Sequence, residues 1–364
     1  MQRWDIQIDR GDIAQARVVD APAADLAAGE IELAIDLIAI TANNVTYAVF
    51  GEPAGILGPD AGYWDFFSRR DGPGRLPVWG FATVARSTVD GIAAGEQFYG
   101  YWPLASHVVM RPERIGRVGF TDGAGRRAGL PAFYNNYQRL AALDDHAAVD
   151  HDLWPVWRPL FVTGWLIADQ LADEGDHGAA QVLVTAASSK TALGFAHAFR
   201  GRTPRPTLIG LTSARSADFV RGTGLYDDVV TYDALDTLPV APVAIVDLAG
   251  DAAVNARLRD RLGDALRFDL VVGATHWDAA RGEGDPAGVA RSFFFAPARI
   301  EKRAGDWGGA VLRQRMGEAW GGFMPVARSL TALDTRDGAA AALAAYRDAV
   351  SGKADPAVAV LVRP

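Results

Sequence analysis

The second half of the chain repeats a short apolar run, a polar turn and a segment with apolar residues at helical spacing. The apolar runs are residues 181–185, 207–211, 228–232, 243–248 and 268–273. Strands that alternate with helices in this way build a parallel sheet with helices on both faces. The pattern therefore predicts an α/β fold with a doubly wound parallel sheet, and it leaves few alternatives for this half of the chain.

The first repeat, residues 182–194, has the form of a strand, a tight turn and a helix start. Its turn ends in Ser188, Ser189, Lys190 and Thr191. The first backbone N–H groups of such a helix, and the positive end of its dipole, point beyond the end of the strand, where a pyrophosphate fits. The three hydroxyls and the Lys190 ammonium would add donors. The usual glycines of a dinucleotide-binding turn are missing except for Gly194, so a plain polar turn with a helix cap is the alternative.

The end of the next strand bears on which dinucleotide would bind. An NAD-binding protein usually has Asp or Glu there for the ribose 2′-OH, whereas a 2′-phosphate needs arginine and hydroxyl groups. This chain has Ser213 and Arg215 at that point. We therefore expect these residues to favour NADPH over NADH, and a merely solvated arginine is the alternative.

The first part of the chain is expected to be rich in β-strands. Strand patterns occupy the first nine residues and residues 30–40, 78–87 and 106–110, whereas residues 120–155 are polar and irregular and should bridge two domains. Helices are expected at 159–173 and 339–350, and a last strand at 357–362 that could return to the first domain. We expect a substrate domain of residues 1–150, completed by 325–364, and a dinucleotide-binding domain of residues 151–324.

Composition excludes several classes of function. The net charge of −8 argues against a nucleic-acid partner or an anionic membrane. The absence of cysteine excludes disulfides, thiolate nucleophiles and cysteine-containing zinc sites, and the six histidines have no H-x-x-x-H spacing, so we expect no metal. His146 and His151, in an acidic stretch, could bind a metal adventitiously, but a solvated loop is the simpler interpretation. The first residues lack the apolar core of a signal peptide, and no run is long enough to span a bilayer, so we expect a cytoplasmic protein.

Taken in order, several segments make the chain resemble the medium-chain dehydrogenase/reductase superfamily over nearly its whole length. Residues 78–87, 94–100 and 104–110 are similar to the glycine-bearing strand, the x-G-D-x-V-x-G segment and the Y-A-E-Y-V-V strand of its zinc-free, quinone-oxidoreductase-like branch. The cofactor repeat follows in the expected place. Residues 224–233 are then similar to G-A-D-x-V-I-N-Y, and residues 339–353 to the closing helix and turn.

The resemblance implies a Rossmann-type domain beside a β-rich GroES-like domain, NADPH as cofactor, and a homodimer formed through the cofactor domain. It also makes Tyr232, near the end of the 224–233 segment, a cofactor-binding residue. Two departures, Ser-Ser-Lys-Thr-Ala in place of the signature glycines at 188–192 and the aromatic run at 63–67, are typical of an uncharacterised subfamily of unknown function. The resemblance therefore implies fold and cofactor but not substrate.

Without a metal, the charge that develops on the substrate after hydride transfer must be stabilised or protonated by a side chain. In the enoyl reductases that the chain resembles, a tyrosine after an N-P-x-D segment donates that proton. Tyr47 and Asn44 lie in the corresponding segment, which we expect to be a loop, with Asn44 positioning substrate or nicotinamide. A buried aromatic with a satisfied hydroxyl is the alternative for Tyr47.

A second group of candidates follows the strand at 268–273. Because the carboxyl ends of parallel strands face the ligand crevice, Gly273 and Thr275 are expected to meet the nicotinamide, and His276 is a candidate acid or a packed side chain. Residues 292–297 should form a strand beside them.

Two functions stay open at this point. The first is an NADPH-dependent reductase of an apolar or aromatic enone, enoyl ester, quinone or ketone. Its bulky substrate would lie in an apolar cleft lined by the aromatic set Trp64, Phe66, Phe67, Trp79, Tyr99, Tyr101 and Trp102. The second is a non-catalytic member of the same fold that binds the dinucleotide as a sensor or structural module, or no longer binds it. Aromatic residues in a β-rich domain can equally be core or cover a dimer interface.

Overall fold

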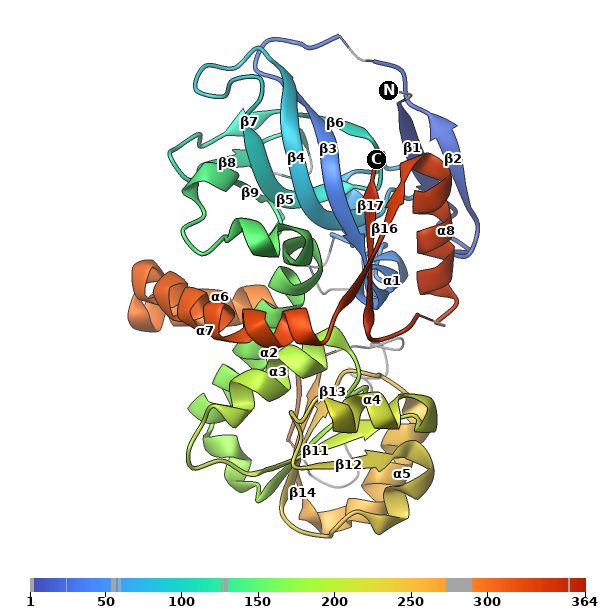
Figure 1. The fold of residues 1–364 in the computed structure, drawn as a ribbon, viewed down its shortest axis with the longest axis vertical. Helices are drawn as coiled ribbons and strands as arrows, with labels where there is room; N and C mark the ends of the chain where they lie inside the picture. The colour runs from blue at the N-terminus through green and yellow to red at the C-terminus, as the bar shows by residue number, and fades with distance from the viewer. Residues whose placement is uncertain are drawn as a thin grey trace. The chain divides into compact units, whose positions relative to one another are not determined.

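The computed structural model describes residues 3–23, 25–53, 57, 60–125, 127, 130–272, 290–352 and 354–364. The chain forms two units (Figure 1). Unit 1 comprises Met1–Val156 and Thr331–Pro364, and unit 2 comprises Trp157–Leu330.

Unit 2 is built on a six-stranded sheet in which every pairing is parallel. Its strand order is β12 (Asp228–Thr231), β11 (Thr207–Thr212), β10 (Gln181–Val184), β13 (Val243–Asp247), β14 (Leu266–Val271) and β15 (Ala290–Phe293). In chain order this is the 3-2-1-4-5-6 arrangement of a doubly wound sheet. The strand order reverses between β10 and β13, and a ligand crevice is expected beyond the carboxyl ends of these two strands.

The central strands of this sheet, β10 and β13, are mostly apolar because both of their faces are covered. All residues of β10 and β13 are buried. On one face a core cluster joins Leu183 and Ile245 to Leu258 of α5 (Ala252–Leu262). The other crossover helices are α3 (Lys190–Arg200) and α4 (Ala217–Gly222). A continuous apolar run, rather than an alternating one, is the pattern that a parallel sheet buried on both faces requires.

Two glycines let α3 pack closely against α2 (Trp154–Asp173), the helix that leads into the sheet. A Cβ atom added to Gly164 would lie 2.4 Å from the Phe195 nitrogen and 2.7 Å from the Thr191 oxygen. A Cβ on Gly194 would lie 3.1 Å from the Cα of Phe161. The two helix backbones are therefore in direct contact, and that contact fixes where α3 begins.

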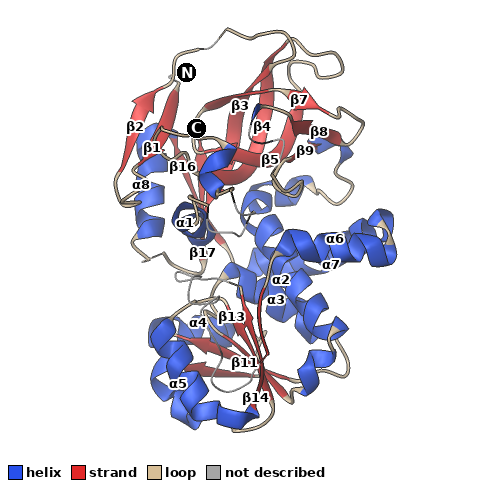
Figure 2. Ribbon diagram, turned by 180° about the vertical axis from the view of Figure 1, so that it is seen from behind, coloured by secondary structure: helices blue, strands red, loops and turns tan. Residues whose placement is uncertain are grey.

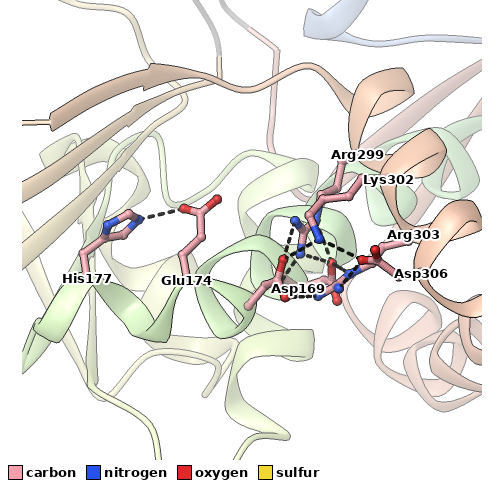
Figure 3. Close-up of polar contacts among 8 residues, drawn as sticks. Asp169, Glu174, His177, Arg299, Lys302, Arg303 and Asp306 are labelled. Atoms are coloured by element: carbon pink, nitrogen blue, oxygen red, sulfur yellow. Dashed lines mark hydrogen bonds and ion pairs between the residues drawn. The ribbon is translucent and has the colours of Figure 1, made fainter.

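Charged residues join α2 to α6 (Ala296–Trp307), which precedes the long helix α7 (Gly309–Ser329). The Asp169 carboxylate accepts from the Nε atoms of Arg299 and Arg303, each at 2.7 Å (Figure 3). Asp173 lies 2.9 Å from Arg299 and 3.1 Å from Lys302. The Lys302 ammonium, followed by Arg299, lowers the pKa of the Asp173 carboxyl to about 2. We name these residues, with Asp306, the α2–α6 ion cluster.

Unit 1 is built on a second, larger sheet of mostly antiparallel strands. Its order is β16 (Ala332–Asp337), β17 (Val358–Arg363), β3 (Ile31–Ile40), β4 (Pro77–Ser87), β5 (Gln97–Pro103), β9 (Asn136–Arg139), β8 (Gly119–Asp122) and β7 (Pro112–Glu113), with β6 (His107–Met110) paired to β3. Among the strands that the structure describes in this sheet, only β16 and β17 pair in parallel. Leu361 of β17 lies opposite Ala39 of β3, so the end of the chain does return to this sheet.

A small hairpin completes the described part of unit 1. Its strands are β1 (Trp4–Ile8) and β2 (Ala16–Asp20), and α8 (Gly338–Val350) packs against both (Figure 2). The Tyr346 hydroxyl on α8 donates to the Ile13 carbonyl at 2.6 Å.

The structure corrects two expectations for unit 1. Residues 120–155 are not irregular throughout, because β8 and β9 lie in this stretch and extend the sheet beyond β5. The segment at 42–49 is not a loop but helix α1 (Ala42–Val49). In unit 2, the strand expected at 292–297 ends at Phe293, and α6 begins at Ala296.

Within the described ranges, no helix combines the length and apolar character needed to cross a bilayer.

Candidate functional site

The turn after β10 has the conformation of a glycine turn although it contains no glycine. Ala186 has φ of +48°, in the left-handed region that glycine usually occupies. Its N–H donates to the Tyr232 hydroxyl at 2.8 Å, and the N–H of Ala187 donates to the Leu211 carbonyl at 3.0 Å. Hydrogen bonds from neighbouring segments thus hold Ala186 in a backbone conformation that glycine would adopt without strain. Because the N–H groups of Ala186 and Ala187 already donate within the protein, a ligand would have to bind N–H groups further along the chain.

A second tyrosine supports the same turn. Tyr226 is buried and its hydroxyl donates to the Ala187 carbonyl at 2.9 Å. Gly210 on β11 makes room for both, because a Cβ there would lie 3.0 Å from the Ala187 Cβ and from the Tyr226 ring. The glycine that permits close packing is therefore on the adjacent strand and not in the turn itself.

The start of α3 offers donors further along the chain. Ser189 is the N-cap, and its hydroxyl accepts from the Ala192 N–H at 3.3 Å. Ser188, Lys190 and Thr191 are half-buried beside it, and the Lys190 Nζ lies 5.8 Å from the centroid of the Trp157 ring. Amides of a first helical turn, hydroxyls and an ammonium are groups that bind phosphate oxygens. The residues present therefore fit the pyrophosphate of a dinucleotide.

The end of β11 carries no acid. The chain continues as Thr212, Ser213, Ala214 and Arg215, and the first carboxylate is Asp218. Ser213 and Arg215 are exposed, and the Ser213 hydroxyl lies 3.4 Å from that of Ser216. A hydroxyl and a guanidinium at this point suit a phosphate better than a ribose diol.

Sequence reasoning missed a polar pair beneath this turn. Thr185, directly after β10, donates to Asp247 at the end of β13 at 2.7 Å, and both side chains are buried. The Asp247 carboxylate also accepts from the amide N–H groups of Ala249 and Gly250 and from Asn255 Nδ2. The pair ties the loops after the two strands at the switch point. Polar residues at the ends of two neighbouring apolar strands are the signal that could have identified it.

In unit 1, Asn44 fixes the start of α1. Its Oδ1 accepts from the Thr41 N–H at 2.7 Å, and its Nδ2 donates to the Pro77 carbonyl at 3.2 Å. The first contact is half of a capping box, and the second ties the helix to β4. Asn44 is buried, and both ends of its amide bind within this unit.

Tyr47, one turn further along α1, is also buried, with 5% of its surface exposed. Its hydroxyl accepts from Asn43 Nδ2 at 2.6 Å and lies 3.3 Å from Trp79 Nε1. The Tyr47 ring contacts those of Tyr63, Tyr101 and Tyr134. Burial, followed by the nearby Tyr134, raises the pKa of the Tyr47 phenol well above its usual value, so the residue is a neutral acid at physiological pH.

The aromatic set expected to line a cleft is packed within unit 1. Each of its members is at least nine-tenths buried: Trp64, Phe66, Phe67, Trp79, Tyr99, Tyr101 and Trp102. This is the packing that a core would show. Gly273, Thr275 and His276 lie outside the described residues.

Two histidines of unit 1 contact one another before α2. His146 Nε2 lies 3.2 Å from His151 Nδ1, and the His151 ring stacks on Phe81. Burial lowers the pKa of both imidazoles. Within the described ranges, no three carboxylate or imidazole side chains are grouped as the ligands of one metal ion would be.

Comparison with known proteins identifies a family and a fold. The family described as "Protein of unknown function (DUF2855)" matches residues 38–355. No curated protein matches the chain.

Solved structures share the fold at low identity. CurA from Vibrio vulnificus in complex with NADPH is 11% identical, with a TM-score of 0.62 over 99% of this chain and 98% of its own. The quinone oxidoreductase from Coxiella burnetii is 14% identical, with a TM-score of 0.60 over 100% of both chains. The yhdH oxidoreductase from Salmonella enterica in complex with NADP is 13% identical, with a TM-score of 0.54 over 100% of both chains. The predicted fold class, a Rossmann-type sheet with a GroES-like β-rich part, is confirmed.

Proposed function

We propose a function for this chain, which belongs to the DUF2855 family of proteins of unknown function: an NADPH-dependent, zinc-independent reductase of a small unsaturated or carbonyl compound. The observation that carries the proposal is the α3 start, where the hydroxyls of Ser188, Ser189 and Thr191 and the Lys190 ammonium would meet a pyrophosphate at the switch point of a doubly wound sheet. The fold shared with structures that hold NADPH or NADP supports it.

NADPH would supply the hydride, and the chain would hold it. Ser188, Ser189, Lys190 and Thr191 are assigned to the pyrophosphate. Ser213 and Arg215 are assigned to the 2′-phosphate because no carboxylate at the end of β11 would repel it. Tyr232 would also bind the cofactor, since its hydroxyl accepts from the Ala186 N–H and keeps its own proton to donate.

The substrate that accepts the hydride is proposed to be an apolar or aromatic enone, enoyl ester, quinone or ketone. Tyr47, as a neutral phenol, would donate the proton. Asn44 would position Tyr47 by fixing the start of α1. Gly273, Thr275 and His276 keep their proposed place near the nicotinamide. We further propose residues 1–150 with 325–364 as the substrate domain, residues 151–324 as the dinucleotide domain, and a cytoplasmic homodimer as the working form.

Calorimetric titration with NADPH and with NADH tests the cofactor assignment. We expect tight NADPH binding and much weaker NADH binding. Lys190→Ala and Arg215→Ala should each weaken NADPH binding, by about tenfold if one charge-assisted hydrogen bond of about 1.5 kcal/mol is lost. Arg221→Ala is the matched control, because Arg221 is also exposed and pairs with Asp218. Unchanged affinity in both basic variants would refute the assignment.

Turnover tests the reductase itself. NADPH oxidation should be followed with a panel of enones, enoyl esters, quinones and ketones. Tyr47→Phe should lower kcat by about 100-fold or more, the usual contribution of a general acid, with little change in NADPH affinity. Full activity in Tyr47→Phe would remove this residue from the mechanism.

A non-catalytic dinucleotide-binding protein is the second candidate. The observation that favours it is the burial of Tyr47, whose hydroxyl is already engaged by Asn43 in unit 1. Tight NADPH binding without oxidation by any compound of the panel would select this candidate.

A further inference from the structure

The Tyr47 hydroxyl receives two N–H donors from two different elements. Asn43 lies four residues before Tyr47, so both side chains lie on the same face of α1, and its Nδ2 is 2.6 Å from the phenol oxygen. Trp79 comes from β4, and its Nε1 is 3.3 Å from the same oxygen. Indole nitrogen is a donor only, so the direction of this contact is fixed.

A phenol oxygen has two lone pairs and one proton. Asn43 and Trp79 donate to the oxygen, and a hydrogen bond from the Tyr101 hydroxyl lowers the pKa of the Tyr47 phenol, so the acceptor capacity of the oxygen is used and its O–H proton is left for donation. The same two N–H groups would remain in place after that proton had left. They would then face a phenolate, for which hydrogen bonds are stronger than for a neutral phenol.

We propose that Asn43 and Trp79 are positioning residues that hold the Tyr47 hydroxyl as a proton donor and stabilise its phenolate after donation. This inference rests on the proposed reductase function and deepens it. In the step, the hydride and its electron pair reduce the substrate double bond, the O–H bond of Tyr47 breaks, and its proton forms a new bond to the resulting carbanion or oxyanion. Water that enters the site after the product has left protonates the phenolate again.

The environment makes such stabilisation necessary. Tyr63, Tyr101 and Tyr134 surround Tyr47, and burial raises the pKa of all four phenols. A phenolate in this setting has little water to solvate it, so fixed N–H dipoles must take that role. Within the tyrosine cluster, the Tyr63 and Tyr134 hydroxyls face each other at 3.3 Å, which supplies no N–H donor to either. Tyr47 differs from them in this respect.

A site-specific titration tests the inference without relying on turnover. A fluorinated tyrosine, which is more acidic than tyrosine, would replace Tyr47 in the full-length protein, and its ionisation would be followed by fluorine NMR. We expect Asn43→Ala and Trp79→Phe each to raise the titration midpoint by about one pH unit or more, because a hydrogen bond to an ion is lost. Trp102→Phe is the matched control, since Trp102 Nε1 donates to the Gly80 carbonyl at 2.9 Å and not to Tyr47.

Activity measurements separate this inference from the proposed function. In unsubstituted protein, Asn43→Ala and Trp79→Phe should lower kcat and leave KM and NADPH affinity close to wild type. Unchanged midpoints in both variants, with folding confirmed by circular dichroism, would overturn the inference even if the wild type is an active reductase. If the midpoints rise but the protein oxidises no NADPH, the role of Asn43 and Trp79 as donors to Tyr47 is supported and the proposed reductase function is refuted.

Discussion

Replacing Gly164 by alanine should destabilise unit 2, although the same change usually strengthens a helix. An added Cβ would lie 2.4 Å, 2.7 Å and 2.9 Å from three backbone atoms of α3. Backbone atoms cannot rotate away as a side chain can, so α2 and α3 would have to separate. Overpacking of this kind costs up to about 3 kcal/mol.

Two opposing effects determine the size of the change. Alanine gains about 1 kcal/mol over glycine within a helix, which offsets part of that cost. The net loss is then about 2 kcal/mol. For a unit of this size that corresponds to a fall in the unfolding midpoint of about 4–8 °C. NADPH affinity should fall as well, because the displaced helix carries Ser189 and Lys190.

Gly321→Ala is the matched control. Gly321 also lies within a helix, α7, but no atom lies within 4 Å of its would-be Cβ. This variant should be as stable as wild type or more stable by up to about 1 kcal/mol. Thermal unfolding followed by circular dichroism measures both. If Gly164→Ala is as stable as Gly321→Ala, the close contact between α2 and α3 is refuted.

Two further predictions concern ion pairs. Asp169→Asn removes one of the two carboxylates that Arg299 and Arg303 share, the other being Asp173, and should cost about 2 kcal/mol in urea denaturation; a loss below about 1 kcal/mol would show that the α2–α6 ion cluster is not coupled. Glu32 is hydrogen-bonded by Arg3 and Arg86, chiefly Arg3, which lowers its pKa from 4.5 to about 2. Its contribution is therefore complete above pH 4.5 and lost as the pH falls toward 2, so Glu32→Gln should flatten the pH dependence of the unfolding midpoint in that window.

Long apolar runs and their alternation with helices made the sheet of unit 2 predictable. β10, β11 and β13 lie where the pattern puts them, because strands covered on both faces must be apolar along their whole length. β8 and β9 were not predicted. They have four residues each, and their pairing partners lie on other segments of the chain. Their sequences, GFTD and NYQR, also lack the apolar run that marks β10, a strand of the same length.

The α1 segment shows a different limit. The resemblance to the enoyl reductases led us to expect a loop around Asn44 and Tyr47, whereas the structure has helix α1 there. In the structure Asn44 caps the helix through Thr41, and its other amide end is bound by the carbonyl of Pro77. The capping pair was visible in the sequence, but the contact from β4 was not. β16 was missed for a related reason, since its residues are half exposed and only its pairing with β17 makes it a strand.

The candidate cofactor turn was located from sequence, but its support was not. Missing glycines suggested an altered turn, whereas the structure keeps the turn through Ala186, with Tyr232 and Tyr226 holding it from neighbouring segments. Tyr232 is 46 residues from Ala186 in the sequence, and Tyr226 is 39 residues from Ala187. No local pattern could reveal it.

The pairing of β17 with β3 imposes an order of events on synthesis. Leu361 must lie beside Ala39, so the sheet of unit 1 cannot be completed until all of unit 2 has left the ribosome. Unit 2 is continuous in sequence and can fold first, while β3 waits with one edge unpaired. A released chain that ends at residue 330 would therefore hold a folded unit 2 and an unpaired edge of β3, which could pair with a strand of another chain.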